Sequence, residues 1–371
     1  MVFKVAQITS VHPATDVRIF HKECKSLANA GYEVVLVAPN SREENMGDIR
    51  ILPIKKHNAR WLRFFSGSFQ VFKITNKNNV GVCHFHDPEL IPIGMLLALM
   101  GKNIIYDVHE DVPRQILSKY WIPIGLRLPL SKCIEFTEWF ASRFFYTAIV
   151  AATDTIAARF PKEKTTTVQN FPMLDEQSAV LRSPYRGRPN NVAYIGGITR
   201  SRGVLENINA FDHIKHIDAR FLLAGSFMDE GLERQCNDLD SWKHVDYRGF
   251  LAREEVWSLL NSARVGLVVL HPLPNYVDAL PIKLFEYMAA GIPVIASDFP
   301  LWRKIVEQAD CGLLVDPLKP EEITTAIDWL LDNPERAERM GENGKRAVHT
   351  LYNWGQEEKK LLSLYESIAN P

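Results

Sequence analysis

The stretch YVDALPIKLFEYMAAGIPVIASD, from Tyr276 to Asp298, places two acids, Asp278 and Glu286, on either side of a Pro-Ile-Lys turn. The turn leads into a short apolar helical pattern and then into a β-branched strand. Pro281 suits the first helical position, after which backbone N–H groups lack partners inside the helix. Such a helix start attracts phosphate. The N–H groups expected to be free are those of Ile282, Lys283 and Leu284.

The helix after this turn has one apolar face, which we expect to be buried and which comprises Leu284, Phe285, Met288 and Ala289. Lys283 and Glu286 then lie nearer the opposite side, where Glu286 could accept hydrogen bonds from paired sugar hydroxyls. The alternative is a solvated Lys283–Glu286 ion pair at i, i+3, worth about 0.2–0.5 kcal/mol. Spacing alone leaves both interpretations open.

Strand-like runs alternate with helix-period segments along nearly the whole chain, which is typical of parallel βαβ units. The 371 residues, 46% of them hydrophobic, suffice for two buried cores. Residues 170–190 lack periodicity and read as a linker. We therefore predict two doubly wound, Rossmann-like α/β domains at residues 1–172 and 188–353, with a C-terminal helix at 354–371 packing back on the first. Ligands of such sheets bind at the carboxyl ends of the strands, so the expected site is a cleft between the domains.

Composition excludes several classes of protein. The chain has 43 Lys plus Arg against 44 Asp plus Glu, so its net charge gives no indication of a nucleic-acid partner. The five cysteines form no C-x-x-C motif and are expected to be buried, reduced thiols. The N-terminus lacks the apolar stretch of a signal peptide, so we expect a cytoplasmic protein. The longest apolar run, Leu90–Gly101, is shorter than the roughly 20 residues that cross a bilayer.

A second motif, YIGGITRSRG from Tyr194 to Gly203, reads as a strand ending in two glycines, then a basic loop and a helix start. It is not G-x-G-x-x-G, so a dinucleotide site is not supported. Its glycines allow close approach of the backbone, and Arg200 and Arg202 could donate guanidinium hydrogen bonds to a diphosphate. A solvated turn with exposed arginines is the alternative.

Together the two stretches resemble the signature of the retaining glycosyltransferases of family 4, which have the GT-B fold. In that family a Gly-Arg turn and a later Lys-Gly flank the donor diphosphate, and an E-x7-E pair follows. The matching residues here are Gly196-Gly197, Arg202-Gly203 and Asp278-x7-Glu286. The resemblance implies that Glu286 holds the nucleotide ribose and that Asp278 lies beside the transferred sugar.

The resemblance implies a full set of site residues. The donor-binding candidates are Gly196, Gly197, Arg200, Arg202, Phe250, Leu251, Ile282, Lys283, Leu284 and Glu286, and the catalytic candidates are His109, Asp278 and Arg202. Three departures from the family pattern affect the identity of the donor: Gly197 stands where Arg is usual, Arg202 where Lys is usual, and Asp278 where Glu is usual.

The N-terminal half resembles bacterial polysaccharide and O-antigen members of the family in SVHPATDVRIFHKECKSLANAGYEVVLVAPN, HFHDPELIPIG and IIYDVHED. His109 matches a family histidine near the donor sugar and the bond that breaks. His12, Asp16 and Arg18 are candidates for acceptor contacts, although Asp16 could instead cap the following helix.

The resemblance implies a retaining, metal-independent hexosyltransferase that uses a nucleoside-diphosphate sugar, with UDP favoured. The acceptor is expected to be a saccharide or a saccharide linked to a lipid through a polyprenyl diphosphate. No cofactor is expected. The alternatives are a non-hydrolysing sugar-nucleotide epimerase and a non-catalytic subunit of a polysaccharide assembly system. We regard the D-x-D tripeptide Asp238-Leu239-Asp240 and the pair His213 and His216, predicted on one helix face, as chance matches to metal-binding patterns.

Between Ile49 and His86 there are seven Lys or Arg residues and no acid. The aromatic residues Trp61, Phe64, Phe65, Phe69 and Phe72 follow helical spacing there, flanked by Arg60, Arg63 and Lys73. One interpretation is a surface for peripheral attachment to an anionic membrane. The other is a helix whose aromatic residues pack into the core of the first domain.

Overall fold

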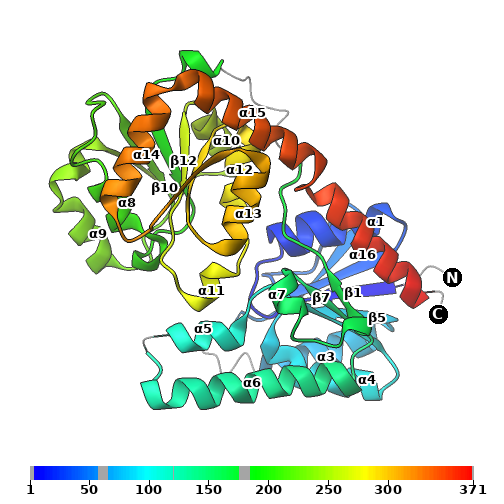
Figure 1. The fold of residues 1–371 in the computed structure, drawn as a ribbon. Coiled ribbons are helices and arrows are strands. Elements are labelled where there is room, and N and C mark those ends of the chain that lie inside the picture. Colours follow the sequence, from blue (N-terminus) through cyan, green and yellow to red (C-terminus); the bar gives the residue numbers. More distant parts are fainter. Residues whose placement is uncertain (1–3, 57–65, 120, 175–183, 370–371) are drawn as a thin grey trace. The chain divides into compact units, whose positions relative to one another are not determined.

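Two sheets of mainly parallel strands, each covered by helices, organise the chain (Figure 1). The computed structural model describes residues 4–56, 66–119, 121–174 and 184–369. The chain divides into two compact units. Unit 1 comprises Met1–Asn170 and Trp354–Pro371, and unit 2 comprises Phe171–Asn353.

Unit 1 has an eight-stranded sheet in the order β3-β4-β2-β1-β5-β6-β7-β8, in which only β3 runs antiparallel to its neighbour. The strands are β1 (Lys4–Ile8), β2 (Glu33–Pro39), β3 (Glu44–Met46), β4 (Ile49–Ile54), β5 (Val82–Phe85), β6 (Asn103–Val108), β7 (Ala148–Ala151) and β8 (Thr165–Thr167). Its described α- and π-helices are a π-helix (Val17–Cys24), α1 (Lys25–Asn29), α3 (Ser68–Lys77), α4 (Ile91–Leu99), α5 (Val112–Ser118), α6 (Ile124–Phe144), α7 (Asp154–Ala157) and α16 (Trp354–Ala369). Strands β3 and β8 have three residues each, too few to show a period in the sequence.

Unit 2 has a six-stranded, wholly parallel sheet in the order β11-β10-β9-β12-β13-β14. Its strands are β9 (Asn191–Ile195), β10 (Arg220–Ala224), β11 (Val245–Gly249), β12 (Val265–Val268), β13 (Val294–Ser297) and β14 (Gly312–Val315). Its α-helices are α8 (Val204–Asn209), α9 (Glu230–Asn237), α10 (Arg253–Asn261), α11 (Pro274–Val277), α12 (Ile282–Ala290), α13 (Pro300–Ala309), α14 (Pro320–Asp332) and α15 (Pro334–Thr350). The predicted apolar face of α12 is buried.

Each sheet has a point where the strand order reverses direction. In unit 1 the chain builds outward from β1 through β2 and then returns to add β5 on the other side of β1. In unit 2 the reversal lies between β9 and β12. The carboxyl ends of strands at such a reversal form the usual ligand crevice of a doubly wound sheet.

The described ends of the segment predicted as a linker pack into unit 2. The Phe171 ring lies 4.7 Å from that of Phe285 and 5.4 Å from that of Tyr352, centroid to centroid. At the other end of unit 2 the chain returns to unit 1, where the indole of Trp354 donates to Ser26 Oγ at 2.9 Å. The C-terminal helix α16 thus belongs to the core of unit 1.

The expectation that all five cysteines are buried is wrong for Cys133. This residue is exposed on the outer side of α6, while the other four are buried. Among the described residues no helix is both long enough and apolar enough to cross a membrane.

Gly225 follows β10 and has a φ of +148°, and a Cβ there would lie 2.0 Å from the carbonyl oxygen of Gly196. We predict that Gly225→Ala lowers the free energy of unfolding of unit 2 by about 1–3 kcal/mol, because two backbone segments must separate. Urea denaturation measures this loss. The matched control is Gly187→Ala, where a Cβ meets nothing within 4 Å. Equal stability of the two variants would contradict the prediction.

Candidate functional site

The carboxyl end of β9 opens into a glycine-rich loop. Gly196 is exposed with a φ of +107°, which favours glycine. Arg202 Nη1 donates to the carbonyl oxygen of Gly197 at 3.1 Å, so its guanidinium lies over the loop. Arg200 instead donates to Gln235 Oε1, on α9. Of the two arginines, Arg202 is the one held beside the glycines.

Lys283, in the first turn of α12, reaches the same loop. Its ammonium lies 3.6 Å from the centroid of the Tyr194 ring, and Nζ is 3.7 Å from where a Cβ on Gly196 would stand. Nζ is buried and makes no hydrogen bond within the described chain. Desolvation, followed by the nearby charge of Arg202, lowers the pKa of Lys283 well below its usual value. Two cations therefore adjoin the glycine loop without a carboxylate bound to Lys283.

Glu286 lies one turn further along α12 and is 6% exposed. Its Oε1 accepts a hydrogen bond from Arg253, on α10, whose guanidinium packs over the Trp257 ring at 5.4 Å. The ion pair of Glu286 with Lys283, left open by the sequence, is not formed; Arg253 is the partner instead. Sequence spacing did not reveal Arg253, because the contact joins residues 33 positions apart.

The remaining donor candidates differ in their environments. The Leu284 N–H donates to Pro281 O at 3.0 Å, so it is not free as predicted. Asp278 is exposed at the end of α11, and its carboxylate makes no hydrogen bond or ion pair with the described residues. Phe250 is 82% exposed just after β11, Leu251 packs against the core of unit 2, and Ile282 is half-buried.

In unit 1, Asp87 follows β5 and ties the two strands at the reversal together. Its Oδ2 accepts from Ser10 N at 2.6 Å and from Thr9 Oγ1 at 2.8 Å, and its Oδ1 lies 3.3 Å from His12 Nδ1. Although burial opposes both charges, this pairing raises the pKa of His12 and lowers that of Asp87 to about 2. His109, half-buried after β6, packs edge-on against His12 at 5.1 Å between ring centroids.

Asp16 and Arg18, expected near the acceptor, have structural contacts. Asp16 Oδ1 accepts from the backbone N–H groups of Arg18 and Ile19, both at 2.9 Å, and so caps the π-helix. Arg18 is 4% exposed, and its Nε and Nη2 donate to the two oxygens of Asp107 at 3.0 and 3.2 Å. This geometry argues against an acceptor contact by Arg18.

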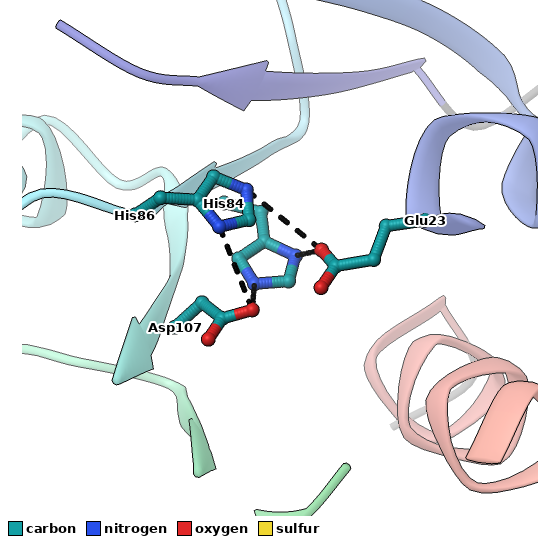
Figure 2. Close-up of side chains that lie close together, drawn as sticks. All are labelled: Glu23, His84, His86 and Asp107. Carbon is teal, nitrogen blue, oxygen red and sulfur yellow. Dashed lines mark ion pairs between the residues drawn. The ribbon is translucent and has the colours of Figure 1, made fainter. Parts of the chain in front are cut away.

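Glu23, His84, His86 and Asp107 form a buried cluster beneath this edge of the sheet (Figure 2). The two imidazoles stack at 4.9 Å between centroids, with the carboxylates on either side. His84 Nδ1 and His86 Nε2 lie 3.8 and 3.7 Å from Glu23 Oε2. The opposite nitrogens lie 3.9 and 3.5 Å from Asp107 Oδ2.

Ligand atoms of these four side chains lie within 4.8 Å of one another, so the cluster could hold a metal ion. Arg18 already supplies a cation there, since Nε lies 3.1 Å from Glu23 Oε1 in addition to its bonds with Asp107. Burial lowers the pKa of both histidines, which favours neutral rings. Burial, then the charge of Asp107, raises the pKa of Glu23 well above its usual value.

Other sequence features are placed outside this site. Asp238 and Asp240 are exposed, and neither belongs to a potential metal-binding group among the described residues. His213 and His216 lie in a turn after α8, not on the predicted helix face, and His216 pairs with Asp332 at 3.0 Å.

On α3, Phe69 is 66% exposed and Lys73 is exposed, whereas Phe72 packs against the core of unit 1. The predicted contributions of Arg60, Trp61, Arg63, Phe64 and Phe65 lie outside the described residues.

We predict that Glu23→Gln changes how stability depends on pH. Because the folded protein keeps the Glu23 proton to a higher pH than the unfolded chain, this group stabilises unit 1 below its unfolded pKa, and that stability is lost as pH rises toward the folded pKa. Glutamine removes this loss. The unfolding free energy of the variant relative to the natural protein should therefore rise as the pH increases above the ordinary glutamate pKa, about 4.3. For the exposed control Glu163→Gln, the difference in unfolding free energy from the natural protein should not depend on pH. The same result for Glu23→Gln would contradict the prediction.

Two family models match the chain: Glycosyltransferase Family 4 over residues 17–172 and Glycosyl transferases group 1 over residues 181–347. The MMP alpha-(1->4)-mannosyltransferase of Mycolicibacterium hassiacum is 24% identical over 76% of this chain and 69% of its own length. The phosphatidyl-myo-inositol mannosyltransferase of Mycolicibacterium smegmatis is 23% identical over 92% and 87%, respectively. Other relatives align over about half of this chain and less than half of their own length.

Among solved structures, sucrose-phosphate synthase from Thermosynechococcus elongatus matches with a TM-score of 0.79 and 19% identity, over 99% of both chains. Anabaena Alr3699/HepE in complex with UDP-glucose matches with a TM-score of 0.73 and 11% identity, over 98% of this chain and 99% of that one. These likenesses confirm the predicted GT-B fold of two Rossmann-like domains.

Proposed function

We propose, from the premise that the chain belongs to glycosyltransferase family 4, that it is a retaining transferase moving a hexose from a UDP-sugar to a saccharide acceptor. Sugar transfer follows from the family. The nucleotide base of the donor, the acceptor and the retention of anomeric configuration are our proposal.

The observation that carries the proposal is the unpaired ammonium of Lys283 beside the glycine loop and Arg202. A buried cation without a counter-ion is costly, and a second cation nearby raises that cost. A diphosphate on the loop would compensate both charges. Gly196 leaves room for such an approach, because the nearest atoms to a Cβ there are Lys283 Cε and Nζ at 3.7 Å.

Departure of a nucleoside diphosphate builds up negative charge on the leaving group. Fixed positive groups aimed at that charge lower the barrier because they need no reorganisation. Lys283 and Arg202 take this role, and the start of α12 adds its partial positive charge. Arg253 fixes Glu286 through Oε1, so that Oε2 can accept from the ribose hydroxyls.

In this proposal His109 and Asp278 act at the sugar. His109 Nδ1 lies 3.8 Å from Asp107 Oδ1, and the ring packs against that of His12. The exposed carboxylate of Asp278 is available to sugar hydroxyls. The acceptor hydroxyl attacks from the face that the diphosphate leaves, so the anomeric configuration is retained, and the departing phosphate helps to remove the hydroxyl proton.

We propose that transfer needs no divalent metal. The reason is chemical: Lys283 and Arg202 already provide cationic charge at the proposed diphosphate position. The cluster of Glu23, His84, His86 and Asp107 has the Arg18 guanidinium as its counter-ion. Chelation by EDTA should therefore leave the rate of transfer unchanged. A rate that falls with EDTA and returns with Mg²⁺ or Mn²⁺ would contradict this.

Two findings support the choice of donor and acceptor. The HepE complex, of the same fold, contains UDP-glucose. A relative that aligns over 92% of this chain is named phosphatidyl-myo-inositol mannosyltransferase, and phosphatidyl-myo-inositol is a lipid. We therefore favour a UDP-sugar donor, a lipid-linked saccharide acceptor in cell-surface polysaccharide synthesis, and a cytoplasmic protein peripheral to the membrane.

A thermal-shift panel of UDP-, GDP-, ADP- and dTDP-sugars tests the donor, because a ligand that binds only the folded state raises its stability. The UDP-sugars should give the largest shift. Product NMR with a saccharide acceptor should then show the donor's anomeric configuration. Absence of any shift, or conversion of the donor without an acceptor, would contradict the proposal.

We predict that Lys283→Met weakens UDP binding about 10- to 100-fold, the equivalent of roughly 1.5–3 kcal/mol for a charged hydrogen bond. Calorimetry measures the loss, and Lys304→Met, at an exposed position on α13, is the matched control. UDP binding by the natural protein should also take up a proton near and above the lowered pKa of Lys283, because the diphosphate raises that pKa. Buffers with different ionisation enthalpies detect this uptake. If Lys283→Met still took up a proton on binding UDP, another group would be the proton acceptor.

A further inference from the structure

The long helix α6 of unit 1 is apolar on its outside and polar on its inside. Ser131, Glu138 and Ser142 are buried. Glu138 accepts from the hydroxyl of Tyr106 at 3.0 Å and from Arg159. This is the reverse of a normal surface helix, whose apolar stripe faces the core.

Large apolar side chains cover the outer surface of α6. The most exposed are Ile124 (82%), Leu126 (59%), Leu128 (59%), Phe136 (62%), Trp139 (44%) and Phe144 (62%). The aromatic rings touch in one row, with centroids 5.7 Å apart for Phe136 and Trp139 and 6.2 Å apart for Trp139 and Phe144. Helix α4 contacts α6 (Figure 1) and carries Leu99, which is 74% exposed.

Two exposed residues of α6 carry positive charge. Lys132 and Arg143 are exposed, whereas Glu138 is buried and Glu135 is partly covered and paired with Lys132 at 2.6 Å. An apolar face with cationic residues at its sides is complementary to an anionic lipid surface.

The first two turns of α6 distinguish lipid from a protein partner. From Ile124 to Leu130 every residue except Arg127 is exposed, so apolar side chains point to more than one side of the helix. A protein surface would cover one side of such a helix. Lipid chains and headgroups can surround it.

We propose that α6 is a membrane-docking helix, which lies in the plane of an anionic bilayer with its aromatic row in the headgroup–acyl boundary. The inference rests on the proposed function, since a lipid-linked acceptor explains why the enzyme needs such a surface. It assigns the membrane contact to α6 and α4 instead of the basic, aromatic segment at 50–77.

Co-sedimentation with vesicles of phosphatidylcholine, with and without phosphatidylglycerol, tests the proposal. The natural protein should pellet with the anionic vesicles, and more at low salt than at high salt. Phe136→Ser with Phe144→Ser should reduce partitioning about tenfold or more, because two aromatic side chains no longer leave water. Ile217→Ser with Leu351→Ser, which changes two exposed residues of unit 2, is the matched control and should pellet like the natural protein.

Cys133 provides a second readout on α6, because the other four cysteines are buried. A polarity-sensitive thiol fluorophore there should shift to shorter wavelength with anionic vesicles. Equal recovery in the supernatant with both lipids and no spectral shift would overturn the proposal, as would a dimer in solution that the double Phe variant converts to monomers. The UDP-induced thermal shift tests the proposed function separately. If the protein binds vesicles but shows no shift with UDP, only the proposed function is contradicted. If it shows the shift but does not bind vesicles, only the docking helix is contradicted.

Discussion

The right-handed crossover between parallel strands is the constraint on which the placement of every candidate residue depends. Each crossover returns the chain to the same edge, so the carboxyl ends of the strands gather there. Where the order reverses, two neighbouring connections leave to opposite faces and open a crevice. Ser10 and Asp87 meet at this point in unit 1, and the loop at Gly196 opens at it in unit 2.

The two units differ in whether a buried cation has a bonded counter-ion. In unit 1 Arg18 donates to Asp107, so the buried cation has a counter-ion within the protein. In unit 2 the Lys283 ammonium has none bonded to it among the described residues. Desolvating an uncompensated charge costs free energy in the unliganded protein, and an anionic ligand removes that cost on binding. The buried arginine of unit 1 is therefore compensated within the protein, whereas Lys283 of unit 2 lacks a bonded counter-ion among the described residues.

The π-helix explains how unit 1 reaches this balance. An α-helix would set residues five apart at roughly 140° around its axis, so Arg18 and Glu23 could not share a face. The wider turn from Val17 to Cys24 brings both inward. Asp16 stabilises the start of that turn by accepting two backbone hydrogen bonds. The sequence left Asp16 open between an acceptor contact and a helix cap, and it could not predict a π-helix, because residues 17–24 have no distinguishing composition.

Most of the strands could be predicted, because strands buried on both faces are continuous apolar runs such as those of β2 and β13. The glycine turn and the start of α12 could be predicted from local signals as well, because Gly marks turns and Pro281 suits a helix start. Contacts between distant residues could not: Glu286 meets Arg253 only after α10 packs beside α12. Similarly, Cys133 is apolar and was expected inside, but the side on which it lies depends on which face of α6 docks.

Two free-energy terms favour opposite orientations of α6: burial of Glu138 with its partners, and burial of the aromatic side chains. Turning Glu138 inward gives Tyr106 and Arg159 a buried partner, but a buried ion pair contributes little net stability once desolvation is counted. Turning Phe136 and Phe144 inward would instead remove large apolar surfaces from water, at about 25 cal/mol per Å². The observed orientation forgoes that gain in the isolated chain. When an apolar phase covers the outer face of α6, this orientation is the favourable one. Phe136 and Phe144 then leave water, and Glu138 keeps its hydrogen-bond partners.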